Sequence, residues 1–194
     1  MQYTSLKLVF GGVEASVLII ANSRGQAFVD HWRQLARRDG MLIPHSTDYL
    51  DHAPAALMPA MFIQEVLDEG LMVRFMGTEL VSRWRRDDTG KIFGAHLSAQ
   101  DRARTVRAGK IVTEHPCGMV QHGVMKTTAE RTAIFEAILL PLAVEAGRPK
   151  RMVVFSILND PLARDEHGKQ FSAPGEREWF DIGAGLPAIL PPSI

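Results

Sequence analysis

The sequence predicts an α+β fold built on one antiparallel sheet, and three features of its hydrophobic pattern support this. Apolar and polar residues alternate from Leu71 to Gly77, a period of two that is typical of a strand with one buried face. The segments 134–142 and 152–158 are apolar on both faces, as in strands that are covered on both sides. Between these regions, the stretch 98–113 begins with a capping serine and has the length of a helix.

Composition limits the classes of protein to which the chain can belong. Its 194 residues, 46% of them hydrophobic, suffice for one ordinary domain and a few flanking elements. The 22 basic and 22 acidic residues cancel, so no overall field favours nucleic acid or a membrane surface as a partner. The single cysteine excludes an internal disulfide and favours a reducing, cytoplasmic location. The apolar run 17–21 is too short for membrane insertion, which needs about 20 residues.

Residues 1–22 form an apolar extension. The segments 6–10 and 13–20 are joined by Gly11 and Gly12, which supply the backbone angles of a tight turn, so a hairpin is predicted. A short helix from Val13 is an alternative that periodicity leaves open over so few residues.

A helix is predicted over 23–38, because Phe28, Trp32 and Leu35 fall on one face. Gly40 ends it, as a C-terminal glycine commonly does. A second helix is expected over 52–57.

Five strands follow from the apolar pattern, over 61–67, 71–77, 117–127, 131–144 and 152–158. Two helices separate the second strand from the third. The first begins at Thr78, the predicted N-cap, and the second has Ser98 as its N-cap. The tail 159–194 is rich in proline and has no sustained periodicity, so it is expected to form an irregular arm.

The letters RFMGTELVSRW and DDTG, in this order, resemble a core pattern of a divergent family of stand-alone bacterial PAS domains, R-f-x-x-x-G-T followed by G-x-D-x-T-G. The resemblance extends from about residue 28 to 158 and includes the helix that ends before the proline-containing loop 43–48. It implies a five-stranded antiparallel sheet with helices inserted between strands 2 and 3, here within a domain of residues 23–158. One departure is Ser46, where relatives carry an arginine two residues after the loop proline.

The resemblance implies a non-catalytic sensory or interaction module of bacterial signalling. Such a module binds a small ligand in an apolar cavity, a protein partner, or both, and its expected partners are a second copy in a homodimer and another signalling protein. The family's fold places these residues around the cavity: Phe75, Met76, Trp84, Phe93, His115 and Phe135.

The cofactor is left open, and neither haem nor flavin is expected. Some PAS proteins hold haem through a histidine on the inserted helix, but His115 precedes Pro116 and lies at the helix end, which suits a surface or cavity-lining position. The flavin-reactive cysteine of light-sensing relatives lies in a helical Asn-Cys-Arg-Phe type motif, whereas Cys117 has Pro116 and Gly118 as neighbours. We expect Cys117 to be a half-buried, inert strand residue. The seven histidines include no pair at i, i+4 spacing, so no metal site is predicted.

Two further hypotheses concern polar residues. A small enzyme that uses a histidine and an acidic residue in the same cavity is the alternative function, although no hydrolase, protease or phosphate-cradling motif is present. The densest basic cluster is expected to be a solvated helical surface, with binding of a phosphate or an acidic partner as the alternative. Its members are Arg83, Arg85, Arg86, Arg102, Arg104, Arg107 and Lys110.

The outer face of the sheet needs a cover, because the two-faced apolar strands cannot leave either side in water. The face formed by Phe28, Trp32 and Leu35, together with the N-terminal hairpin, is predicted to supply it. This cover lies either within one chain or across a symmetric dimer, which makes the three residues interface candidates.

Overall fold

The computed structural model describes residues 6–10, 13–17, 20, 22–94, 97–188 and 190. For residues 6–10, 13–17 and 170–175 it describes the backbone alone.

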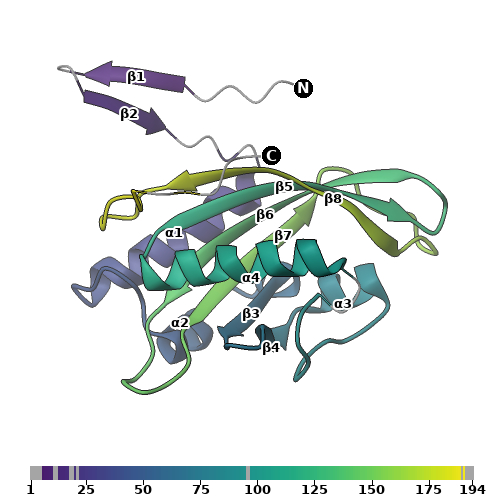
Figure 1. The fold of residues 1–194 in the computed structure, drawn as a ribbon, viewed down its shortest axis with the longest axis horizontal. Coiled ribbons are helices and arrows are strands. Elements are labelled where there is room, and N and C mark those ends of the chain that lie inside the picture. The colour runs from purple at the N-terminus through teal and green to yellow at the C-terminus, as the bar shows by residue number, and fades with distance from the viewer. Residues whose placement is uncertain are drawn as a thin grey trace.

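The centre of the fold is a six-stranded antiparallel sheet in the order β4-β3-β7-β6-β5-β8 (Figure 1). Helices α3 (Thr78–Trp84) and α4 (Ala99–Glu114) are inserted between β4 and β5, and the five strands predicted from the sequence are confirmed. The strands are β3 (Met61–Val66), β4 (Leu71–Met76), β5 (Gly118–Thr127), β6 (Thr132–Leu142), β7 (Arg151–Leu158) and β8 (Gly168–Phe180).

The sixth strand corrects the prediction of an irregular arm over 159–194. β8 runs beside β5 from the pair Thr127–Gly168 to the pair Gly118–Phe180, and its register shifts at three places along the way. Pro174 and Gly175 lie within it and interrupt the alternation on which a strand prediction depends. A proline is tolerated there because β8 is the edge strand of the sheet.

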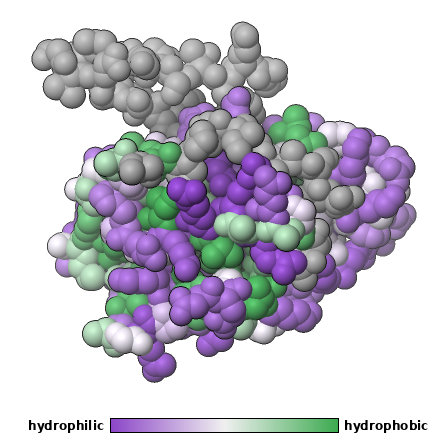
Figure 2. All heavy atoms as spheres, viewed as in Figure 1, coloured by the Kyte–Doolittle hydropathy of each residue, from purple (hydrophilic) through white to green (hydrophobic). Residues whose placement is uncertain are grey.

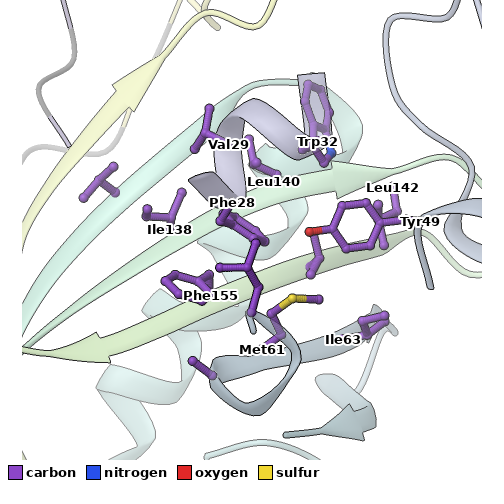
Figure 3. Close-up of a cluster of buried hydrophobic side chains, with 14 of the residues drawn as sticks. Phe28, Val29, Trp32, Tyr49, Met61, Ile63, Ile138, Leu140, Leu142 and Phe155 are labelled. Carbon is purple, nitrogen blue, oxygen red and sulfur yellow. The ribbon is translucent and has the colours of Figure 1, made fainter. Parts of the chain in front are cut away.

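One face of the sheet is covered by α1 (Ser23–Arg38) and α2 (Ser46–His52). Phe28 stacks on Phe155 with ring centroids 5.1 Å apart, and Trp32 Nε1 donates to the carbonyl oxygen of Pro141 at 2.9 Å. Figure 3 shows the α1-side cluster that results, which contains Phe28, Val29, Trp32, Tyr49, Met61, Ile63, Ile138, Leu140, Leu142 and Phe155. The apolar face of the helix therefore covers the outer face of the sheet within one chain.

This packing buries the three interface candidates within the single chain. Phe28, Trp32 and Leu35 are all at most 5% exposed. Exchange of the helix between two chains stays a prediction. The predicted N-terminal hairpin is confirmed at the level of the backbone, since β1 (Leu6–Phe10) pairs antiparallel with β2 (Val13–Val17). Its side chains and its glycine turn lie outside the described residues, so its part in the cover stays a prediction too.

The opposite face of the sheet is covered by α4 with α3 beside it (Figure 1). The Ser98 side chain caps α4 as predicted, because its Oγ accepts from the backbone N–H of Asp101 at 3.1 Å. Figure 2 shows hydrophilic side chains over this face of the molecule, with hydrophobic ones between them. The α4-side cluster beneath contains Leu71, Ala108, Val112, Met119, Phe135, Ala137, Leu139, Met152 and Val154.

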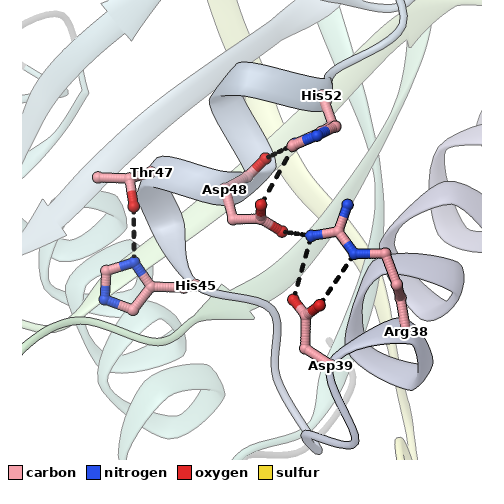
Figure 4. Close-up of polar contacts among 6 residues, drawn as sticks. All are labelled: Arg38, Asp39, His45, Thr47, Asp48 and His52. Carbon is pink, nitrogen blue, oxygen red and sulfur yellow. Dashed lines mark hydrogen bonds and ion pairs between the residues drawn. The ribbon is translucent and has the colours of Figure 1, made fainter.

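The second helix lies earlier than predicted, over Ser46–His52 and not over 52–57. Pro54 explains the error, because the residue before a proline is disfavoured in the helical region, and Ala53 is the extended C-cap residue that follows the last helical residue, His52. Ser46 lies at the start of α2, and its Oγ accepts from Arg151 Nη1 at 3.3 Å. Arg38 at the end of α1 binds both Asp39 and Asp48 (Figure 4), which ties the two helices together.

Candidate functional site

A cavity of about 110 Å³ lies between the α4-side face of the sheet and helices α3 and α4. Its wall is mostly apolar, with a small number of polar side chains from the sheet and from both helices. The apolar members are Phe62, Val73, Met76, Leu80, Trp84, Phe93, Leu97, Phe135, Ala137, Leu139 and Val154, and the polar members are Gln64, Arg83, Asp101, Thr105, Gln121 and Ser156.

Four of the six residues expected around the cavity line it, namely Met76, Trp84, Phe93 and Phe135. Trp84 is held against β8, because a Cβ atom at Gly168 would lie 2.5 Å from its Cζ3. The glycine thus lets the indole approach the backbone of the strand.

Phe75 faces the other way, and a β-bulge is the reason. Ile63 is opposite Phe75, but the next residue of β3, Gln64, is opposite Val73, so Arg74 is the extra residue of the bulge. Strict alternation would put Val73 and Phe75 on the same face. With the bulge, Val73 faces the cavity while Phe75 packs against the α1-side cluster, and Met76 lines the cavity in its place.

His115 does not line the cavity. It is the C-cap residue of α4 and is exposed. Cys117 is fully buried and not half-buried as expected, and burial raises the pKa of its thiol to about 11. The thiol is therefore protonated at neutral pH, which suits an inert residue.

Arg83 is the functional candidate that sequence analysis missed, because it was assigned to a solvated basic surface. Its residue exposure is only 5%, and it donates from Nη1 to Ser156 Oγ and from Nη2 to the Ser156 carbonyl oxygen, both at 2.9 Å. Its neighbours in the sequence behave as expected of a surface: Arg85 is exposed, and Arg86 pairs with Asp88 at 2.7 Å. The signal for burial was helical spacing, since Arg83 follows the buried Leu80 by three residues.

The charge of Arg83 is only partly balanced. Burial lowers the pKa of its guanidinium to about 10, against the opposing effect of the Glu79 carboxylate, and the group stays protonated at neutral pH. Glu79 lies 3.7 Å from Arg83 but 3.0 Å from Arg24, so one carboxylate serves two guanidinium groups. This group of three side chains carries a net positive charge beside the cavity.

Two residues that line the cavity each have one buried side-chain nitrogen without a hydrogen-bond partner among the residues that the structure describes. These nitrogens are Arg83 Nε and Gln64 Nε2, and Gln64 is 2% exposed. A buried donor without an acceptor costs about 1–3 kcal/mol, so such atoms are unusual in a finished core. Both are consistent with a wall that is completed by a bound molecule.

The described part of the chain contains no cluster of three or more His, Cys, Asp or Glu residues that could hold a metal ion. Within the same part, no helix is both long and apolar enough to cross a membrane.

Comparison with known families agrees with this architecture. A family model described as "PAS domain" matches residues 20–156, well over half of the chain. The chain belongs to the PAS domain family. The matched region of the PAS domain includes α1, α2, both inserted helices and nearly all of the five expected strands. No curated protein and no solved structure matches at the significance level applied.

Because of the cavity, replacing two buried alanines of the α4-side cluster by leucine should change the free energy of unfolding by different amounts. Ala137→Leu should change the free energy of unfolding by less than about 1 kcal/mol, because the new carbons enter open space, whereas Ala108→Leu should cost about 1–3 kcal/mol. Ala108 is the control, since it is 1% exposed and packs in the same cluster without lining the cavity. Urea denaturation measures both. Equal, large losses would show that the space beside Ala137 is already filled.

Proposed function

We propose that this PAS domain is a non-catalytic sensory module of bacterial signalling in the cytoplasm, and that the cavity is its ligand site. PAS domains are sensory modules, which supports the general role. The observation that supports the site is the cavity itself, an apolar space between sheet and inserted helices with a few polar groups in its wall. The wall of this cavity includes residues of α3, of α4 and of the five strands β3 to β7, so a bound ligand can change how the helices pack on the sheet.

The cavity wall argues against the alternative, an enzyme with a histidine and an acid in this space. Among the described lining residues there is no histidine, and Asp101 is the sole carboxylate. Asp101 lies in the first turn of α4, where its Oδ2 accepts from Ser98 Oγ at 2.7 Å. It is thus occupied in capping the helix, and a general acid–base pair lacks its second member.

We propose further that the PAS domain acts through protein partners, as a homodimer that contacts another signalling protein. Light scattering on the full chain tests the first part and should give the mass of two chains at micromolar concentration. The mass of one chain, unchanged on concentration, would contradict the homodimer but not the ligand site.

Ligand binding without turnover is the behaviour expected of a sensory module. In a screen of small organic molecules against the full chain, a ligand at a hundredfold excess over its Kd should stabilise the protein by about 2.7 kcal/mol. For a chain of this length that corresponds to a rise in Tm of roughly 5–10 °C. The ligand should be recovered unchanged, and Ala137→Leu, which fills the cavity, should weaken the response. Conversion of a bound molecule to product would contradict the proposal.

A further inference from the structure

We propose that the cavity of this PAS domain binds a small organic monocarboxylate, with the carboxylate on Arg83 and the apolar body against the aromatic wall. This inference rests on the proposed function, because it names the ligand class of the same cavity.

The positive charge of Arg83 is only partly compensated by its neighbours. Glu79 is the one carboxylate within 4.0 Å of the Arg83 guanidinium among the described residues, and it is nearer to Arg24. A buried cation with so little compensation is costly unless another anion pairs with it. Arg83, Arg24 and Glu79 together therefore carry one net positive charge beside the cavity.

Two hydrogen-bond donors of residues that line the cavity lack acceptors among the described residues. An arginine Nε–H can only donate, and the Arg83 Nε is buried without an acceptor among the described residues. The Gln64 side-chain amide, on β3 of the sheet, has a second donor without an acceptor among the described residues. A carboxylate offers about four lone-pair sites and accepts from a planar guanidinium in a bidentate manner. The two donors match an acceptor-rich ligand and would reject an ammonium group.

The size and polarity of the cavity limit the ligand as well. An engineered apolar cavity of about 150 Å³ holds one benzene molecule, so this smaller cavity of about 110 Å³ suits an apolar body no larger than a branched chain of three or four carbons. Phe62 and Phe93 stack with ring centroids 5.6 Å apart and, with Leu80, form part of the apolar wall. A fully hydrated ion such as phosphate has nothing to gain from that wall.

Asp101 limits the ligand to one negative charge. It is only half-buried and lines the cavity at the start of α4, so the second carboxylate of a diacid would meet either this like charge or the apolar wall. The arrangement thus favours monocarboxylates of the size of isobutyrate or isovalerate.

The test compares each acid with its neutral amide of the same shape by calorimetry on the full chain. Isobutyrate and isovalerate should bind the wild type at least about tenfold more tightly than isobutyramide and isovaleramide, because the amides carry no negative charge and replace one acceptor oxygen by an NH2 donor. Arg83→Met should remove this preference, and Gln64→Leu should reduce it. Arg85→Met is the matched control, since Arg85 lies two residues away and is exposed, and it should bind like the wild type.

The outcomes separate this inference from the proposed function. Amides that bind the wild type as tightly as the acids would overturn the carboxylate assignment and leave the cavity as a ligand site. Binding of inorganic phosphate in place of the organic acids would contradict the inference that the ligand has an apolar body. Should Arg83→Met fail to fold, the Arg83 Nε–H signal in the NMR spectrum of the wild type still decides, because isovalerate should shift it. No shift at saturating isovalerate would overturn the assignment.

Discussion

Strands β6 and β7 are buried on both faces, and the rest of the fold follows from the need to cover them. Their residues alternate between the two clusters, with Phe155 on the α1 side and Val154 on the α4 side. A strand of this kind cannot lie at a water-exposed surface, so each face needs its own layer. The chain supplies one layer before the sheet, as α1, and the other from within it, as α3 and α4.

The two layers are packed differently, and this difference creates the site. On the α1 side, large aromatic side chains such as Phe28 and Trp32 fill the space and are at most 2% exposed. On the α4 side, the bulge at Arg74 turns Phe75 away and leaves Met76 in the wall. The small side chains of Ala137 and Ser156 also face this space. A cavity remains where a fully packed core would have none.

Arg83 is the feature of this cavity that stability alone does not explain. Desolvation of a charged side chain costs several kcal/mol. Burial disfavours the charged form of Arg83 and so lowers the pKa of its guanidinium. The two hydrogen bonds to Ser156 offset part of this cost, and Glu79, which lies 3.7 Å away and is shared with Arg24, offsets a further part. Perturbed and incompletely paired groups in a cavity are typical of functional sites.

Much of this structure could be predicted from the sequence, and the errors have local causes. The strands and the helices α1, α3 and α4 were found because alternation, helical spacing and residues such as Ser98 are short-range signals. β8 was missed because Pro174 interrupts its pattern, although an edge strand tolerates proline.

The errors at the site come from features that the sequence does not display. A bulge is a property of two paired strands, so nothing around Phe75 shows that its side chain leaves the cavity. Arg83 is one arginine among several in the sequence, and only the packing of α3 against the sheet separates it from Arg85.

The central claim is that Arg83 is retained for a ligand and not for the stability of the fold. Urea denaturation of the ligand-free Arg83→Met variant tests it directly, with Arg85→Met as the control. Replacing buried ionic groups by apolar side chains of similar volume is often neutral or stabilising, provided that no buried partner charge is left behind. Glu79 is partly exposed and keeps Arg24 as its partner at 3.0 Å when Arg83 is replaced. The unfolding free energy of Arg83→Met should equal or exceed that of the wild type. A loss of more than about 3 kcal/mol, the size expected when a well-compensated buried charge pair is broken, would contradict it and make Arg83 a structural residue.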